Sequence, residues 1–375
     1  MSQNRIWLFR LISALIGLAV ALIMSELILH VYAGRAVDKE HMDPGLIQYH
    51  SKLGWKLASG WRGMHRHIDY EVEYNTDIKG LRRAGSMAPN SNAEGHRKKN
   101  ATRHSTLVFG DSFTFGLGVS DHETFVARLN QTQREIEYIN GGVPGYAPDQ
   151  VLLWSENAVR LTNPDHFVFV LYLGNDLVDL GLPFPVQAAH GKPFAAVDVD
   201  DSGLEKLVLR NIPVPMQEKP PALKQQTLGS YLLGGKEGSS RYGLRVVDLI
   251  VTSFKTLDAE TISILQQKID SSLELFELVY VDFLRRNLPT NEGATATLVL
   301  LPGASYVKEP DSVAGVYQSL ASKSLIKLAS EKSWALVDLG SGLSAATDEP
   351  LYFPNDGHLT PVGHQVVADL LRESF

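Results

Sequence analysis

The chain has 375 residues, of which 44% are hydrophobic and 21% charged, and this balance is typical of a globular protein with one or two domains. Its formal net charge of −7 disfavours a nucleic-acid-binding protein, because such proteins usually carry a basic surface. The chain has no cysteines, which excludes disulfides, thiolate metal sites and a cysteine nucleophile.

The first predicted element is an apolar helix over residues 11–29, LISALIGLAVALIMSELIL. A helix of this length nearly crosses the bilayer core of about 30 Å, and Trp7 and Tyr32 flank it as interfacial aromatics do. We therefore expect residues 1–33 to be a signal-anchor or transmembrane segment, with its N-terminus in the cytoplasm and the rest of the chain exported. The alternative is a signal peptide cleaved after Val31-Tyr32-Ala33, which would give a secreted protein.

Residues 34–105 are expected to form a polar N-terminal extension followed by a linker. The alternation from Tyr70 to Tyr74 predicts a short strand, and residues 88–105, rich in Asn, Ser, Lys, Arg and His, predict an exposed linker. Trp55, Trp61 and Tyr70 are expected to form a small core, with a sugar-binding platform as the alternative.

His65 and His67 in this extension are spaced as two metal ligands can be, but no partner cluster accompanies them. We expect them to be an exposed pair on a strand or loop, so no metal is predicted.

From Thr106 onward, apolar strand-like runs alternate with helical patterns. The predicted strands are Thr106–Phe109, Ile136–Ile139, His166–Leu173, Thr297–Leu301 and Ala335–Leu339. The predicted helices are Glu123–Asn130, Pro148–Leu161, Ala259–Leu288, Ser312–Ser330 and Pro361–Leu371. This alternation predicts an α/β domain over 106–375, in which helices cover both faces of a five-stranded, mainly parallel sheet.

The interval 180–258 interrupts the alternation and is rich in proline and glycine. Loops of this length inside a compact domain are usually functional or disordered. We expect an insertion that forms a lid or substrate-binding wall, with a poorly ordered excursion as the alternative.

Four segments place polar side chains and glycines at the ends of the predicted strands or in the loops that follow them, the side on which α/β proteins bind ligands. They are Gly110-Asp111-Ser112, Asn140 to Gly145, Gly174-Asn175-Asp176 and Asn355-Asp356-Gly357-His358. Together the four blocks resemble, in the same order, those of the SGNH hydrolases, also called the GDSL esterase/lipase superfamily. The resemblance covers Thr106 to Phe375 and implies a three-layer sandwich of SGNH or flavodoxin-like type.

The resemblance implies that Ser112 is the nucleophile and His358 its general base. Asp356 would orient the imidazole, although the commoner block has its aspartate one residue earlier, where this chain has Asn355. A backbone carbonyl or a distant carboxylate are the alternatives for that role. His364 is expected to be a helix residue and not the base.

The resemblance further implies an oxyanion hole made of the backbone N–H groups of Ser112 and Gly145 and the side-chain amide of Asn175. Asp111 and Asp176 are expected to brace these loops by local hydrogen bonds. Gly141 and Gly142, by contrast, are expected only to form a turn.

The N-terminal part resembles membrane-anchored bacterial members of the superfamily, with Leu53-Gly54-Trp55 and with Asn75 ahead of Gly80-Leu81-Arg82. The expected activity is therefore that of a serine esterase that removes O-acyl groups, especially O-acetyl, from cell-envelope or exported carbohydrate, without a cofactor. The alternatives are an O-acyltransferase that uses the same triad on a polysaccharide, and a non-catalytic carbohydrate-binding or assembly protein. The expected partners are an acylated carbohydrate and the membrane, but no nucleic acid; no oligomeric state is predicted.

Overall fold

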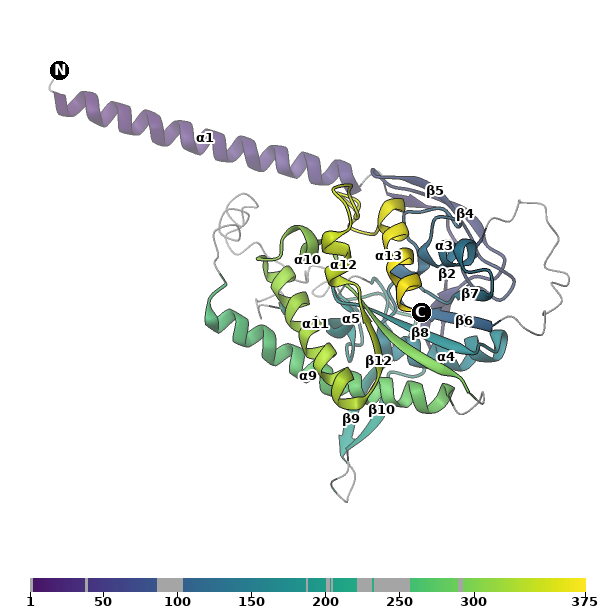
Figure 1. Ribbon diagram of the computed structural model, residues 1–375. Coiled ribbons are helices and arrows are strands. Elements are labelled where there is room, and N and C mark those ends of the chain that lie inside the picture. Colours follow the sequence, from purple (N-terminus) through teal and green to yellow (C-terminus); the bar gives the residue numbers. More distant parts are fainter. Residues whose placement is uncertain are drawn as a thin grey trace.

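A computed structural model of the chain describes residues 3–37, 40–85, 104–186, 188–199, 203, 205–220, 231–232, 257–288 and 293–375. Its centre is a five-stranded sheet in which every neighbouring pair of strands is parallel (Figure 1). The strands are β6 (His104–Phe109), β7 (Ile136–Asn140), β8 (His166–Tyr172), β11 (Thr295–Leu301) and β12 (Ala335–Asp338). The predicted strands and their parallel arrangement are thereby confirmed.

The strands lie in the order β12-β11-β8-β6-β7, so the chain first adds β7 on one side of β6 and then adds the remaining strands on the other. This is the flavodoxin-like order, and its topological switch point lies between β6 and β8. In open α/β sheets, ligands bind at the carboxyl ends of the strands at such a point.

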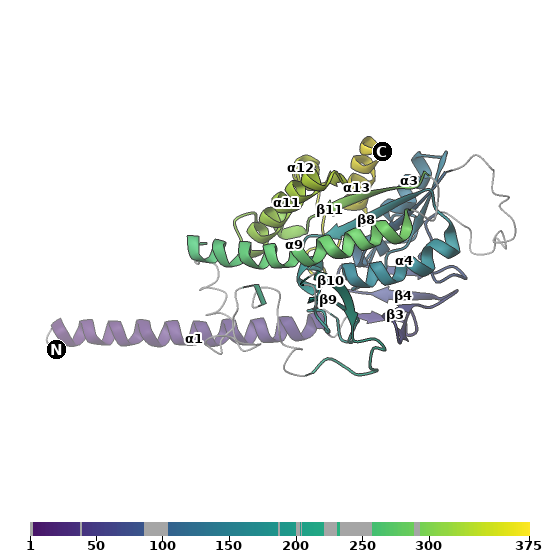
Figure 2. The ribbon, with the colours of Figure 1, turned by 90° about the horizontal axis from the view of Figure 1, so that it is seen from below.

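Helices cover both faces of the sheet and give the molecule three layers (Figures 1 and 2). On one face lie α4 (Pro148–Thr162), α9 (Ala259–Asn287) and α11 (Val313–Lys332). On the other lie α3 (Phe125–Thr132), α12 (Gly340–Ala345) and α13 (Pro361–Ser374). Three shorter helices are α2 (Ser112–Phe115), α5 (Asp176–Asp179) and α10 (Ala304–Lys308).

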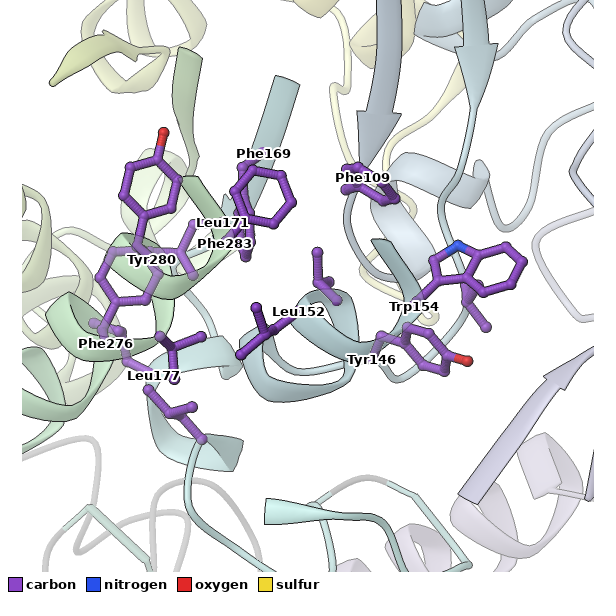
Figure 3. Packing of buried hydrophobic residues seen from close by; sticks show 14 of the residues in the cluster. Phe109, Tyr146, Leu152, Trp154, Phe169, Leu171, Leu177, Phe276, Tyr280 and Phe283 are labelled. Atoms are coloured by element: carbon purple, nitrogen blue, oxygen red, sulfur yellow. The ribbon is translucent and has the colours of Figure 1, made fainter. Parts of the chain in front are cut away.

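Strand β8 is apolar along its length because successive side chains enter different layers. Phe169 packs against α9, where it meets Phe283 edge-on with ring centroids 5.2 Å apart (Figure 3). Val170 is buried in the opposite layer. On α9, Phe276 and Phe283 are seven residues apart and therefore lie on the same face of the helix. This packing holds β8 in place against α9, and it thereby fixes where the loop after β8 begins.

The N-terminal extension contains β1 (His41–Met42), β2 (Ile47–His50), β3 (Gly54–Leu57), β4 (Arg62–Arg66) and β5 (Glu71–Asn75). Strand β5 confirms the strand expected there, and it forms an antiparallel hairpin with β4. The extension shares a core with the sheet domain, since Trp55 and Tyr74 belong to the same buried cluster as Phe115 and Tyr146. The core role expected of Trp55 is confirmed. The division of the chain at residue 105 stays a prediction.

The expected exposure of the two histidines is wrong, because the His65 side chain is 1% exposed and the His67 side chain 11%. Alternation along β4 turns His65 inward, where its Nδ1 is 2.9 Å from the Tyr74 hydroxyl. Among the described residues, no group of three or more His, Cys, Asp or Glu side chains is arranged to hold a metal ion.

Helix α1 (Gln3–Val37) contains the apolar N-terminal run and extends from the body of the molecule in Figure 1. Counting only the residues that the structure describes, no helix reaches the combination of length and apolar character that a membrane span requires.

The described part of the interval 180–258 contains an antiparallel hairpin, β9 (Phe194–Val199) and β10 (Glu205–Arg210). Just before this hairpin, Lys192 attaches the insertion to α4 through an ion pair between Lys192 Nζ and Asp149 Oδ2 at 2.6 Å. Neither side chain of this pair is exposed. The Lys219 ammonium donates to the carbonyls of Pro185 and Val186, each at 2.7 Å. Positions 221–230 and 233–256 lie outside the described residues, as does nearly all of the linker expected at 88–105.

Candidate active site

The candidate nucleophile lies where β6 ends and α2 begins. Ser112 is the first residue of α2, and the Asp111 carboxylate caps the helix by accepting a hydrogen bond from the Phe113 amide at 2.9 Å. A Cβ on Gly110 would lie 2.2 Å from Thr114 Oγ1, so a side chain at this position would displace Thr114 of α2. The hydroxyl of Ser112 thus lies at the carboxyl end of β6, beside the switch point of the sheet.

The candidate base reaches Ser112 from the other end of the chain. His358 Nε2 is 2.7 Å from Ser112 Oγ, and His358 Nδ1 is 2.8 Å from Asp356 Oδ2. The imidazole packs against the Phe113 ring, with centroids 4.7 Å apart. The structure therefore brings together the serine, histidine and aspartate that the resemblance implied, in one continuous chain of hydrogen bonds.

The protonation of this chain follows from the surroundings of Asp356. Burial acts to raise the pKa of Asp356, but the hydrogen bond and charge of His358 outweigh it and hold the pKa below its usual value. The carboxylate is therefore ionised at neutral pH and fixes a proton on His358 Nδ1. That tautomer leaves Nε2 free to accept the proton of Ser112.

Asn355 occupies the position of the commoner aspartate but does not take part in this chain. Its side-chain amide donates instead to Asp69 Oδ1 at 2.6 Å. Gly357 lies between Asp356 and His358 and has φ of +81°, a conformation that favours glycine. The resulting turn lets the His358 side chain reach the Asp356 carboxylate.

The loop after β7 carries Gly145 and is fastened to the nucleophile helix. The Asn140 side chain donates to the Thr114 carbonyl at 2.8 Å and accepts from the Gly142 amide at 3.0 Å. Gly142 does more than form a turn, since a Cβ there would lie 2.7 Å from the Thr114 carbonyl carbon. Gly145 has φ of +77°, a conformation that favours glycine. The close approach of loop and helix depends on Gly142, and the turn that follows it on Gly145.

Trp55 of the extension holds the same loop from outside. Its indole N–H donates to the Pro144 carbonyl at 2.9 Å, and the Tyr146 hydroxyl donates to the Trp55 carbonyl at 2.7 Å. A Cβ on Gly145 would be 3.3 Å from the Trp55 ring and 3.9 Å from Ala188 of the insertion. The insertion therefore borders the loop that carries Gly145.

Asn175 follows the end of β8 and is held by Asp179. Its Nδ2 donates to Asp179 Oδ2 at 2.7 Å, and Asp179 Oδ1 accepts from the Val186 amide at 2.6 Å. An amide nitrogen carries two hydrogens, so one remains for a ligand. Asp179 thereby couples the amide of Asn175 to the insertion.

Asp111 and Asp176 are buried braces beneath the site, as expected. Asp176 Oδ2 accepts from the Tyr172 amide at 2.8 Å, as Asp111 does from Phe113. Burial raises the pKa of Asp111 to about 6, and burial together with the nearby Asp111 carboxyl raises that of Asp176.

His364 lies on α13 and is not a second base. It is 1% exposed, its Nδ1 accepts from the Phe125 amide at 3.2 Å, and burial lowers its pKa to about 3. A neutral histidine that accepts a backbone hydrogen bond is a core residue here, in agreement with the expectation.

Three residues that support the site were not predicted from the sequence in this role. Asp69 binds the backbone of Asp356, Trp55 binds the loop that carries Gly145, and Asp179 binds the side chain of Asn175. Asp179 lies four residues after Asn175 in a short helix, and that spacing is a signal that could have been used. Asp69 and Trp55 reach the site from far away in the sequence, and no local pattern indicates such contacts.

No known protein-family model matches the chain, and no curated protein does. Among solved structures, a member of the lipolytic G-D-S-L family from Veillonella parvula is 12% identical, with a TM-score of 0.37, covering 72% of this chain and 98% of its own. A lipase/acylhydrolase from Enterococcus faecalis is 14% identical, with a TM-score of 0.36, covering 72% and 94%. The lipase Lip_vut3 from a goat rumen metagenome is 12% identical, with a TM-score of 0.41, covering 72% and 97%. At this level of similarity, a function has to follow from the chain's own residues.

Proposed function

We propose that this protein is a serine ester hydrolase of the SGNH type. The observation that carries the proposal is the hydrogen-bonded chain Asp356–His358–Ser112, with contacts of 2.8 and 2.7 Å, at the switch point of a flavodoxin-like sheet. Three side chains from two distant segments meet in the order that serine activation requires. His358 and Asp356 keep 18% and 12% of their side chains exposed, so the site opens to solvent.

In the proposed reaction, Ser112 Oγ attacks the ester carbonyl carbon while His358 Nε2 takes its proton. The tetrahedral intermediate collapses as the imidazolium returns that proton to the leaving alcohol, which leaves an acyl group on Ser112. Water then attacks the acyl-enzyme with His358 again as base, and the carboxylic acid departs. Asp356 stabilises the imidazolium in both halves of the reaction.

The negative charge on the intermediate requires hydrogen-bond donors around the carbonyl oxygen. We assign this role to the backbone N–H groups of Ser112 and Gly145 and to the Asn175 amide, which come from the loops after β6, β7 and β8. Such donors are effective because their positions are fixed before the charge develops. Asp179 and Trp55 supply that fixation for two of them.

The proposed substrates are O-acyl esters, especially O-acetyl, on cell-envelope or exported carbohydrate. Support comes from the resemblance of the N-terminal part to membrane-anchored members of the superfamily. Under this proposal α1 anchors the chain, with its N-terminus in the cytoplasm and the hydrolase on the outer side. Reporter fusions at the two termini, together with fractionation of the full chain, would test this topology. Recovery of the full-length hydrolase in the soluble cytoplasmic fraction would contradict it.

The activity is tested with the full chain and its Ser112→Ala variant, using aryl esters of increasing acyl length and acetylated glycans. We expect wild-type turnover and a loss of roughly 10³-fold or more in the variant. Ser120→Ala, a change of the same size beyond α2, is the matched control and should leave the rate unchanged. A phosphonate probe should label Ser112 in the wild type alone.

Product analysis with an added glycan acceptor separates release of the free acid from acyl transfer. Equal activity of wild type and Ser112→Ala would refute the assignment, and a wild type that neither turns over esters nor reacts with the phosphonate would do the same.

A further inference from the structure

The tip of the β4–β5 hairpin touches the loop that carries the candidate acid and base. A two-residue turn joins the strands, with the His67 amide donating to the Tyr70 carbonyl at 2.8 Å. Asp69 is the second residue of this turn, and its side chain is only 5% exposed. A carboxylate at a hairpin tip normally points into water, so its burial here needs an explanation.

Three hydrogen bonds explain it. Asp69 Oδ2 accepts from the backbone N–H groups of Asn355 and Asp356, each at 2.9 Å, and Asp69 Oδ1 accepts from the Asn355 side chain at 2.6 Å. All three donors belong to two consecutive residues, and one of these residues is the candidate acid. One carboxylate therefore fixes both the position and the orientation of the peptide that carries Asp356.

These bonds are made by an ionised group. Burial acts to raise the pKa of Asp69, but the three donors and the nearby His67 outweigh it, and the pKa lies below its usual value. Hydrogen bonds to a charged acceptor are about twice as strong as those between neutral groups.

The rest of the hairpin is packed in the same place. The Tyr70 ring contacts the Phe353 ring, with centroids 5.1 Å apart, at the start of the loop that ends with His358. The Tyr74 hydroxyl accepts from the Gly118 amide at 2.8 Å, just beyond the nucleophile helix. The hairpin thus contacts both the serine side and the histidine side of the candidate site, and Asp69 cannot swing away without disturbing these contacts.

We propose that Asp69 is a positioning residue of the reaction, acting through Asp356 from an extension outside the catalytic sheet. It holds the peptide of Asn355 and Asp356 so that Asp356 Oδ2 meets His358 Nδ1. The role of Asn355 follows: at the place where the commoner block has its aspartate, this chain has the third donor to Asp69. The inference rests on the function proposed above.

The first test is steady-state kinetics on an acetyl ester with Asp69→Ala and Asp69→Asn in the full chain. We expect kcat to fall about 10- to 100-fold in Asp69→Ala, since a displacement of about 1 Å at a catalytic group can cost 10²-fold. Asp69→Asn keeps one acceptor oxygen and should lose less. KM should stay within twofold, because Asp69 acts on the acid and not on the substrate.

Glu71→Gln is the matched control. It removes a carboxylate from the same hairpin, where Glu71 pairs with Arg66 in an exposed position, and it should leave kcat unchanged.

A second readout does not depend on turnover. The proton shared by His358 Nδ1 and Asp356 should give a low-field proton NMR signal in the wild type and in Glu71→Gln, and the signal should broaden or vanish in Asp69→Ala. Values of kcat within twofold of wild type together with an unchanged signal would overturn the proposal. A wild type that shows the signal but hydrolyses no ester would refute the esterase, and the NMR arm would still decide the role of Asp69.

Asn355→Ala guards against the outcome that Asp69→Ala fails to fold. It removes only the side-chain donor and leaves the two backbone donors on Asp69 in place. We expect a loss in kcat of about two- to fivefold, smaller than that of Asp69→Asn, and no change in kcat would count against the proposal.

Discussion

Replacing Gly142 with alanine should damage both stability and activity, because this glycine lies directly against the nucleophile helix. Its added Cβ would be 2.7 Å from the Thr114 carbonyl carbon and closer still to the Phe115 amide nitrogen, whereas ordinary contact begins at 3.4 Å. The two nearest neighbours are backbone atoms, so the loop that carries Gly142 must itself move by about 1 Å. Overpacking of this kind costs about 1–3 kcal/mol, and a displacement of that size in the site costs about 10²-fold in rate.

The assay combines thermal unfolding with kcat on an acetyl ester, for a series of three glycines. Gly141→Ala places its Cβ 3.1 Å from the Val108 carbonyl oxygen and should be intermediate, while Gly85→Ala meets nothing within 4 Å and should behave as wild type. Each kcal/mol should lower Tm by about 1–2 °C in a chain of this length. The reasoning is refuted if Gly142→Ala keeps its Tm and at least half of its kcat, or if Gly141→Ala is the more damaged variant.

Asn175→Ala should lower kcat by about 10²–10³-fold, since it removes one of the three proposed oxyanion donors. Single-turnover kinetics would measure this loss. Lys192→Met should lower the free energy of unfolding by about 3–5 kcal/mol in urea titrations, because it leaves the fully buried Asp149 without its ion-pair partner. For Asp111, burial raises the pKa from 3.8 to about 6, so the native state binds this proton more tightly than the unfolded chain does. Its contribution to stability is therefore present below pH 4 and is lost as the pH rises through 6. Asp111→Asn should gain stability relative to wild type between pH 4 and pH 7, as urea titrations at several pH values would show.

Each of these predictions has a contrary outcome. A loss below tenfold in Asn175→Ala would remove Asn175 from the oxyanion hole. Lys327→Met is the control for the buried pair, because Lys327 and its partner Glu331 are 79% and 57% exposed and contribute little; equal losses in the two lysine variants would contradict the argument. A stability difference for Asp111→Asn that does not change with pH would show that its carboxyl is not perturbed.

The layered sheet was predictable because β8 and β11 are mainly apolar runs and because the five strands alternate with helical patterns, as they do in a parallel sheet that helices cover on both faces. Ser112 and His358 were predictable because short sequence blocks carry the chemistry of the site, one directly after β6 and the other in the loop before α13. The strand and helix limits differed by a few residues, as at β6, which begins at His104 and not at Thr106.

The supports that come from the extension, Asp69 and Trp55, were not predictable, because they depend on which surfaces of the extension dock on the sheet domain. His65 illustrates the difficulty, since alternation along β4 assigns its residues to two faces but does not say which face the rest of the protein covers. Asp69 poses the same difficulty. Aspartate is common in hairpin turns, so the sequence gives no sign that the fold brings Asn355 to this carboxylate. Interactions between distant segments are set by the fold, and local sequence patterns do not report them.

The reciprocal contact between Trp55 and the loop of Tyr146 has a practical consequence for producing a shorter, soluble protein. A chain cut at the start of β6 would retain every proposed catalytic residue, and would look complete on the basis of its sequence blocks. It would also leave the Tyr146 hydroxyl and the Pro144 carbonyl without their partners on Trp55, and expose the apolar surface that the extension covers. Truncations that remove only α1 and begin near residue 40 preserve these contacts, so crystallisation and screening are best started from that boundary.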